Sequence, residues 1–203
     1  MDPMQPTVDT QQRILDSARE LIFSRSYADV GVAAICEHAG VKKGSFYHFY
    51  PSKQALTLAV LDAQYIDIKD NMIRKAFSED IPPLARLARF VEMAYQFQKQ
   101  INAQTGLVLG CLFGNLANEL SSQDEPIREK IQHTFSKLQQ AIDGVLQAAQ
   151  AEGDLPQTVD TSATAQAMLA YFEGVLLLAK NQNDPELIRQ LLPSMAHLRI
   201  THS

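Results

Sequence analysis

Apolar residues recur along most of the chain at intervals of three and four, and this periodicity constrains the fold more than any other feature. Such spacing gathers apolar side chains on one face of an α-helix, whereas a half-buried strand needs strict alternation. Alternating runs of useful length do not occur. Nine glycines and nine prolines in 203 residues, with the prolines mainly between periodic segments, also favour long helices. We therefore expect an all-α protein of about nine helices.

The ends of the periodic segments place these helices, because capping residues, glycine and proline mark helix termini. A disordered lead-in is expected over residues 1–9, and Asp9 or Thr10 is expected to cap the first helix. Further helices are predicted over 32–39, 42–47, 52–77 and 83–104, within 107–120, between Asp124 and Gly153, and with starts at 160–161 and 184–185.

Composition excludes several classes of protein. The formal net charge of -5 argues against general coating of nucleic acid but permits a focused contact. Two cysteines, Cys36 and Cys111, make no disulfide framework, and the polar N-terminus is not a secretory signal. Apolar runs stay short of the roughly 20 residues that a membrane span needs. We therefore expect a cytoplasmic protein with no membrane segment.

One short stretch of this acidic chain is basic. Residues 41–53 contain Lys42, Lys43 and Lys53 and no acidic residue. The short helices predicted on either side of Gly40 make a helix-turn-helix, a motif whose second helix enters the major groove of double-stranded DNA. The stretch is therefore predicted to contact DNA phosphates.

This region resembles the TetR family of bacterial transcriptional regulators. The residues that carry the resemblance are Ala39-Gly40-Val41, Lys43-Gly44-Ser45-Phe46-Tyr47-His48-Phe49-Tyr50, Lys53 and Leu56, within a match over about residues 12–61. It implies an N-terminal DNA-binding domain over 1–53, with a linking helix from about 52, and a C-terminal effector-binding and dimerisation domain over 54–203. It also implies repression relieved by a small molecule, without enzymatic activity or cofactor.

The resemblance places the DNA contacts on the second helix of the motif and at its exit. Ser45 can bond to a base edge or a phosphate, Tyr47 offers a donor to phosphate oxygens, and Gly44 lets the backbone approach the groove. The predicted DNA-binding residues are Lys42, Lys43, Gly44, Ser45, Tyr47, His48 and Lys53. Two departures weaken other contacts: Gly31 stands where the family often has a capping Ser or Thr, and no basic residue precedes Arg13.

The last two long helices are more apolar than one covering face requires. A thick core would explain this, and so would half of a four-helix dimer interface. We favour the interface, because a helix-turn-helix protein reads two half-sites with a two-fold partner, its reading helices about 34 Å apart. The predicted assembly is a homodimer on a palindromic operator.

A second resemblance concerns residues 110–116, Gly-Cys-Leu-Phe-Gly-Asn-Leu, with Glu119 beyond. It is similar to the branch of the family that includes the N-ethylmaleimide-responsive and acrylate-responsive repressors. That implies that Cys111 senses electrophiles or oxidants, helped by Lys180. A helix start near Gly110 and a nearby ammonium would each lower the pKa of the thiol. Two alternatives stay open: Cys111 as a small buried hydrophobe, and a non-covalent inducer.

Several aromatic and polar residues are candidates to line an effector cavity, and each is individually better explained as a core or surface residue. They are Tyr95, Phe97, Phe113, Asn115, Asn118, Glu119, Tyr171 and Glu173. The histidines show no metal-ligand spacing, and no phosphate-binding loop or nucleophile motif occurs. A helical enzyme or ligand-binding bundle that does not bind DNA is therefore the weaker alternative.

Overall fold

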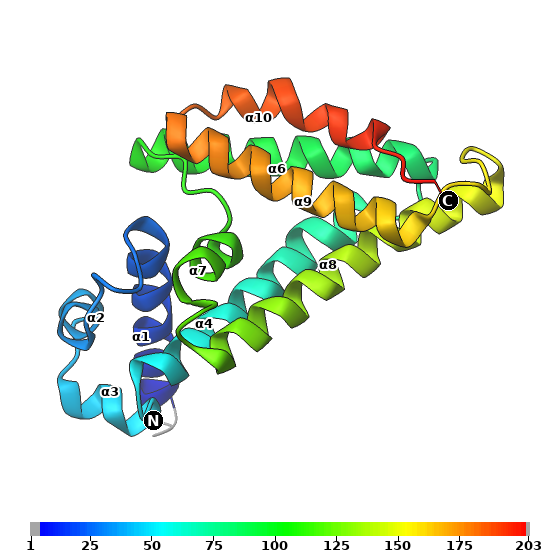
Figure 1. Cartoon of the computed structure of the whole chain (residues 1–203). Coiled ribbons are helices and arrows are strands. Elements are labelled where there is room, and N and C mark those ends of the chain that lie inside the picture. The colour runs from blue at the N-terminus through cyan, green and yellow to red at the C-terminus, as the bar shows by residue number, and fades with distance from the viewer. Residues whose placement is uncertain (1–4, 202–203) are drawn as a thin grey trace. The chain divides into compact units, whose positions relative to one another are not determined.

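The computed structural model describes residues 5–201, and over that range the chain is built from α-helices (Figure 1). Nine helices result when the π-helical turn η1 (Lys69–Ile73) and α5 (Arg74–Ala76) are counted with α4 (Lys53–Ile68), which they continue. The others are α1 (Gln5–Ser24), α2 (Val32–Ala39), α3 (Lys43–Phe49), α6 (Pro83–Thr105), α7 (Leu112–Leu120), α8 (Glu125–Glu152), α9 (Thr161–Gln182) and α10 (Glu186–Leu191) with its 3₁₀ extension η2 (Leu192–His197). The predicted all-α class is confirmed.

The chain forms two compact units. The first unit contains the residues up to Tyr65 together with Asn115–Ile131, and the second contains Ile66–Gly114 and the residues from Gln132 onward. Helices α4, α7 and α8 therefore each contribute to both units. The predicted functional division at residue 53 is a different boundary, and it stays a prediction.

Local sequence explains the short helices of the first unit. α2 ends at Gly40, whose φ of 63° and ψ of 39° lie in the left-handed region that favours glycine. At the start of α4, the Ser52 Oγ accepts a hydrogen bond from the Ala55 N–H at 3.0 Å, as the predicted cap requires. Phe46 of α3 is fully buried. One face of α3 is therefore anchored in the core while the helix ends are set by neighbouring residues.

The predicted start of α1 is wrong. The helix is already formed at Gln5, so Asp9 and Thr10 lie within it and do not cap it. Pro6 falls in the first turn, where proline is tolerated because its missing N–H has no partner there. Asp9 faces Arg13 one turn later, with their charged atoms 4.0 Å apart. Of the expected lead-in, residues 1–4 lie outside the described residues.

The second unit has a continuous apolar core. α6, α9 and α10 contribute Leu87, Met168 and Ile188, each fully buried, and α8 adds further members. The start of α9 is as predicted, because the Asp160 carboxylate accepts a hydrogen bond from the Ala163 N–H at 2.9 Å. The core and this cap together hold the long helices of the unit.

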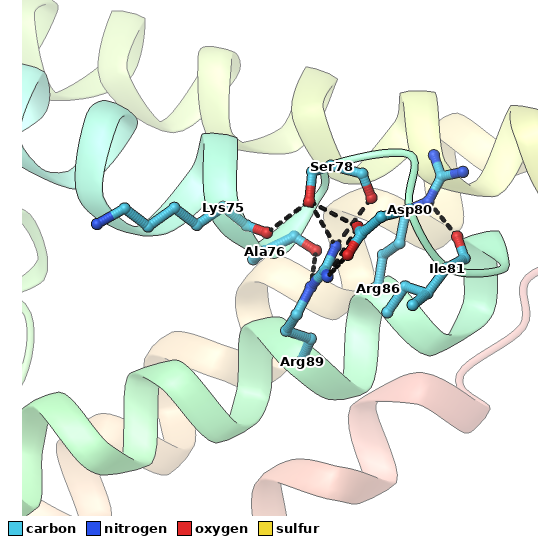
Figure 2. A network of polar contacts seen from close by, with 7 residues as sticks. All are labelled: Lys75, Ala76, Ser78, Asp80, Ile81, Arg86 and Arg89. Carbon is cyan, nitrogen blue, oxygen red and sulfur yellow. Dashed lines mark hydrogen bonds and ion pairs between the residues drawn. The ribbon is translucent and has the colours of Figure 1, made fainter.

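Two arginines of α6 close the corner between α5 and α6 (Figure 2). Arg89 donates from Nε to the Ala76 carbonyl at 2.8 Å and from Nη1 to the Asp80 carboxylate at 2.9 Å. Arg86 Nε donates to the Ile81 carbonyl at 2.9 Å. The predicted break between the two helices therefore has carbonyls satisfied by side chains of the helix that follows.

By length and composition, α9 is apolar enough to cross a membrane, which the sequence had not indicated. One such helix is weak evidence, because the core helix of a soluble protein passes the same test. In this fold α9 supplies Met168, Val175 and Leu176 to the core of the second unit. Core packing accounts for part of its apolar character, since 39% of its most apolar window is buried.

Candidate DNA interface and effector site

The predicted reading helix, α3, turns one face outward. Six of the predicted DNA-binding residues lie on it or at its N-cap, namely Lys42, Lys43, Gly44, Ser45, Tyr47 and His48. All are exposed except Ser45, which is partly buried. Tyr47 is 56% exposed, whereas the neighbouring Phe46 is fully buried. The Tyr47 ring is therefore exposed beside the lysines, and the DNA contacts of these residues stay a prediction.

Lys53, the seventh predicted contact, is engaged within the first unit. Its Nζ donates to the carbonyls of Tyr27 at 2.8 Å and of Val30 at 3.1 Å, and it lies 3.7 Å from the centre of the Tyr27 ring. Burial lowers the pKa of Lys53, and the Glu119 carboxylate opposes that effect. These contacts occupy two of the three ammonium donors. Lys53 thus has a structural role that the sequence did not reveal, beside its predicted DNA contact.

Glu119, a predicted cavity residue, binds the backbone of the first unit. Its Oε2 accepts a hydrogen bond from the Tyr27 N–H at 2.9 Å, and its Oε1 accepts one from the Ala28 N–H at 2.7 Å. Both carboxylate oxygens therefore hold the turn between α1 and α2. This is a structural role that the sequence did not reveal, and the effector contact of Glu119 stays a prediction.

Cys111 immediately precedes α7, where its sequence predicted a helix start. Its Sγ accepts a hydrogen bond from the Gly114 N–H at 3.4 Å, as an N-cap side chain does. Burial, followed by the charge of Glu173, raises the pKa of the thiol well above its usual value, although the Gly114 and Phe113 amides act in the opposite direction. The expected lowering of the pKa is therefore wrong, because burial and an acidic neighbour outweigh the helix start.

Lys180 lies beside the turn that carries Cys111. A Cβ on Gly110 would stand 3.4 Å from Lys180 Cδ and 3.6 Å from the Leu176 carbonyl oxygen. Gly110 also has a φ of 73°, so both the close approach and the backbone favour glycine. The lysine is thus near the position that the resemblance implied, and its effect on the thiol stays a prediction.

The sequence reading missed Gln98. Its Nε2 donates to the Gly110 carbonyl at 2.8 Å, and its Oε1 accepts from the Gly110 N–H at 3.1 Å. The side chain is only 3% exposed. This pair of hydrogen bonds fixes the turn before Cys111. A polar residue that continues the apolar stripe of Val91 and Ala94 was the available signal.

Glu173 of α9 is the acid beside Cys111. Burial raises its pKa to about 7, and a hydrogen bond with the thiol opposes that shift. Its Oε2 fills the space that a Cβ on Gly114 would need. Its Oε1 is buried and has no hydrogen-bond partner among the described residues. An unsatisfied buried acceptor is costly, so this carboxyl keeps a capacity to bind a donor.

The remaining cavity candidates have other surroundings. The Tyr95 hydroxyl donates to the Glu186 carboxylate, and the Tyr171 hydroxyl donates to the Leu191 carbonyl at 2.9 Å. The rest differ in exposure: Phe113 is buried, Asn115 is partly buried, and Phe97 and Asn118 are exposed. Over residues 5–201, no group of three or more His, Cys, Asp or Glu side chains is arranged to hold a metal ion.

Two family models match the chain. "Bacterial regulatory proteins, tetR family" covers residues 14–60, which include the helix-turn-helix, and "Tetracyclin repressor-like, C-terminal domain" covers residues 83–195, more than half of the chain. The chain therefore belongs to the TetR family. It is a DNA-binding transcriptional repressor with a C-terminal ligand-binding domain.

Individual relatives agree with this assignment. The transcriptional regulator AcuR of Cereibacter sphaeroides is 32% identical over 86% of this chain and 78% of its own length. The transcriptional repressor NemR of Escherichia coli is 24% identical over 95% of each chain. The crystal structure of a regulatory protein TetR from Rhodobacter sphaeroides covers 93% of this chain and 98% of its own, with a TM-score of 0.82 and 29% identity. These relatives are named as regulators and not as enzymes.

Proposed function

We propose that the protein is a homodimer that binds a palindromic operator through α3 and leaves it when an effector acts on the C-terminal domain. The supporting observation is the outward face of α3, where Lys42, Lys43, Tyr47 and His48 are exposed together with no acidic residue among them. Lysines that neutralise phosphates release counterions, which is the main source of affinity for DNA. A DNA-binding bacterial repressor works in the cytoplasm, where we place this chain.

The surface of α9 supports a dimer interface made with α8. Leu177 and Leu178 of α9 are 54% and 48% exposed. Gly174, about one turn earlier, and Gly144 on α8 are also exposed, so the backbone of a partner helix can approach closely. Apolar side chains exposed in neighbouring positions usually mark a contact with another molecule. Two copies that pair these helices would form a four-helix interface.

Operator binding is tested with the double variant Lys42→Ala/Lys43→Ala on a duplex that covers the DNA upstream of the protein's own gene. The slope of log affinity against log salt should decrease by about two, because two phosphate contacts are lost. Lys75→Ala removes an exposed lysine of the second unit and serves as the matched control. A slope that stays at the wild-type value would refute the contact.

For the effector, we propose covalent modification of Cys111 by an electrophile or oxidant, with Lys180 as its helper. The similarity of residues 110–116 to the branch of the N-ethylmaleimide-responsive and acrylate-responsive repressors supports this route. A modified thiol would add bulk at the start of α7. A non-covalent inducer is the second candidate, because the raised pKa of the thiol disfavours the reactive thiolate, and the unpaired Oε1 of Glu173 is available to a donor group.

The two routes separate when wild type, Cys111→Ser and Cys36→Ser are treated with N-ethylmaleimide or hypochlorite before operator binding is measured. The covalent route predicts that wild type and Cys36→Ser release the DNA while Cys111→Ser holds it. Cys36 is buried and is the matched control. If Cys111→Ser responds as the wild type does, Cys111 is not the sensor.

A further inference from the structure

The turn between α1 and α2 is held by a residue from a distant part of the sequence. Glu119 receives hydrogen bonds from the adjacent amides of Tyr27 and Ala28, at 2.9 and 2.7 Å. Hydrogen bonds to an ionised acceptor are stronger than neutral ones, and a carboxylate that accepts two at once also fixes the direction of the peptide units. Glu119 is therefore a positional restraint on the segment that leads into the helix-turn-helix.

A cation holds the same turn through its carbonyls. Lys53 donates to Tyr27 O and Val30 O and lies over the Tyr27 ring. The Tyr27 residue thus has its N–H bound by Glu119 and its C=O bound by Lys53. Lys53 is the first residue of α4, directly after the exit from α3. The turn therefore joins the segment before α2 to the segment after α3.

Other contacts of the first unit tie α4 to the start of α8 but do not reach this turn. Gln54 Nε2 donates to Asp124 Oδ2 at 2.8 Å, and Lys130 Nζ donates to Asp62 Oδ1 at 2.7 Å. Glu119 differs from these residues because it accepts hydrogen bonds from backbone amides just before the helix-turn-helix. It also lies in the last turn of α7, the helix that starts beside Cys111.

We propose that Glu119 is a positioning residue for operator binding, which orients the helix-turn-helix by holding the amides of Tyr27 and Ala28. The proposal rests on the proposed function, because it assumes that α3 binds the operator. Glu119 does not touch DNA in this scheme. It acts through the turn and, with Lys53, through both ends of the reading motif.

The test compares wild type, Glu119→Gln, Glu119→Asp and the control Glu129→Gln, an exposed glutamate of α8 in the same unit. Operator affinity is measured by fluorescence anisotropy on the duplex upstream of the gene, over a range of salt. Hydrogen exchange follows the Tyr27 and Ala28 amides. Glu119→Gln should bind about tenfold more weakly, since a charge-assisted pair is lost, although removal of a negative charge alone would favour DNA. The salt slope should not change, because the same phosphates are contacted.

Four outcomes decide the matter. Weaker binding with an unchanged slope and faster exchange at both amides, partly restored by Glu119→Asp and absent from Glu129→Gln, supports the proposal. Faster exchange with operator affinity within twofold of wild type shows a merely structural hydrogen bond and overturns it. Equal weakening by Glu129→Gln overturns it as well. A wild-type protein that does not bind the duplex overturns the proposed function itself and this proposal with it.

Discussion

Two sites, the reading helix α3 in the first unit and Cys111 in the second, differ in how far apart along the chain their decisive contacts lie. In the first unit, Gly40, Phe46 and Ser52 shape and anchor α3 from within one short stretch of sequence. In the second unit, burial and then the charge of Glu173, a residue of α9, raise the pKa of the Cys111 thiol. A reading helix can therefore be found from local pattern. The chemistry of a thiol depends on which distant side chain lies beside it.

The largest expected effect tests whether removal of the buried Phe46 side chain of α3 disrupts the first unit and leaves the second unit folded. Phe46→Ala removes a fully buried ring and should lower the free energy of unfolding by about 3–5 kcal/mol. Phe90→Ala removes a ring that is 6% exposed in the second unit and is the matched change. At a temperature where both variants remain dimeric, only Phe46→Ala should lose operator binding.

Circular dichroism, size-exclusion chromatography and operator titration together check this prediction. The melting curve of Phe46→Ala should lose the helical signal of the first unit before that of the second. If both variants lose operator affinity equally while they stay folded, the two units are not separable in the way that the sequence pattern implies.

Fold class, most helix positions and the exposed face of α3 were predictable because they depend on periodicity, caps and neighbouring residues. The start of α1 was not, since nothing in the composition of residues 5–9 distinguishes a helix from a lead-in. Lys53 and Glu119 both contact the turn between α1 and α2, although the three segments are far apart in the sequence. A local sequence pattern cannot predict such contacts. The predicted lowering of the Cys111 pKa was wrong for a similar reason, because burial raises that pKa and so does Glu173, which comes from another helix.

A smaller effect, with a definite pH dependence, is expected from Glu173→Gln in the second unit. Burial raises the pKa of Glu173 from 4.5 to about 7. Between these values the folded protein holds a proton that the unfolded chain has lost, so stability falls as pH rises through this window. The shift corresponds to about 3 kcal/mol, which partial exposure reduces to about 2 kcal/mol.

Glutamine cannot ionise, so Glu173→Gln should be more stable than wild type by about 2 kcal/mol at pH 8 and equal to it near pH 4.5. Urea denaturation at fixed protein concentration measures the difference, with the exposed Glu152→Gln as control. The variant should also react faster with N-ethylmaleimide at pH 8, because a charge that raises the thiol pKa is gone. If the difference in stability between Glu173→Gln and wild type does not depend on pH, Glu173 is not a buried titrating acid. Its proposed influence on Cys111 would then lose support.

The Lys53→Ala variant tests whether Lys53 stabilises the fold, contacts DNA, or does both. Loss of its two hydrogen bonds to backbone carbonyls should lower stability by about 1–2 kcal/mol. Loss of its predicted phosphate contact should reduce the salt slope by about one. Lys42→Ala, at an exposed position, should change the slope by a similar amount without lowering stability. A wild-type slope in Lys53→Ala, beside a loss of stability, would leave this lysine with its structural role alone.

The smallest effect concerns Gly31, the N-cap residue of α2. Its φ of -84° and ψ of 160° suit any residue, no side chain caps the helix, and a Cβ there would meet no atom within 4 Å. Gly31→Ser can therefore offer its Oγ to the amides of Ala33 or Ala34, and it should stabilise the protein by about 0.5–1 kcal/mol.

Gly31→Ala is the control, because it reduces the freedom of the unfolded chain equally but provides no cap. The difference between the two variants in urea denaturation isolates the hydroxyl, and operator titration shows whether that hydroxyl also reaches a phosphate. Higher stability of Gly31→Ser with unchanged operator affinity would show that a serine at this position caps the helix and does not contact a phosphate. If Gly31→Ser and Gly31→Ala have the same stability and the same operator affinity, the hydroxyl does not cap α2. Local sequence would then fail to predict a helix start in the first unit, where it predicted α3 correctly.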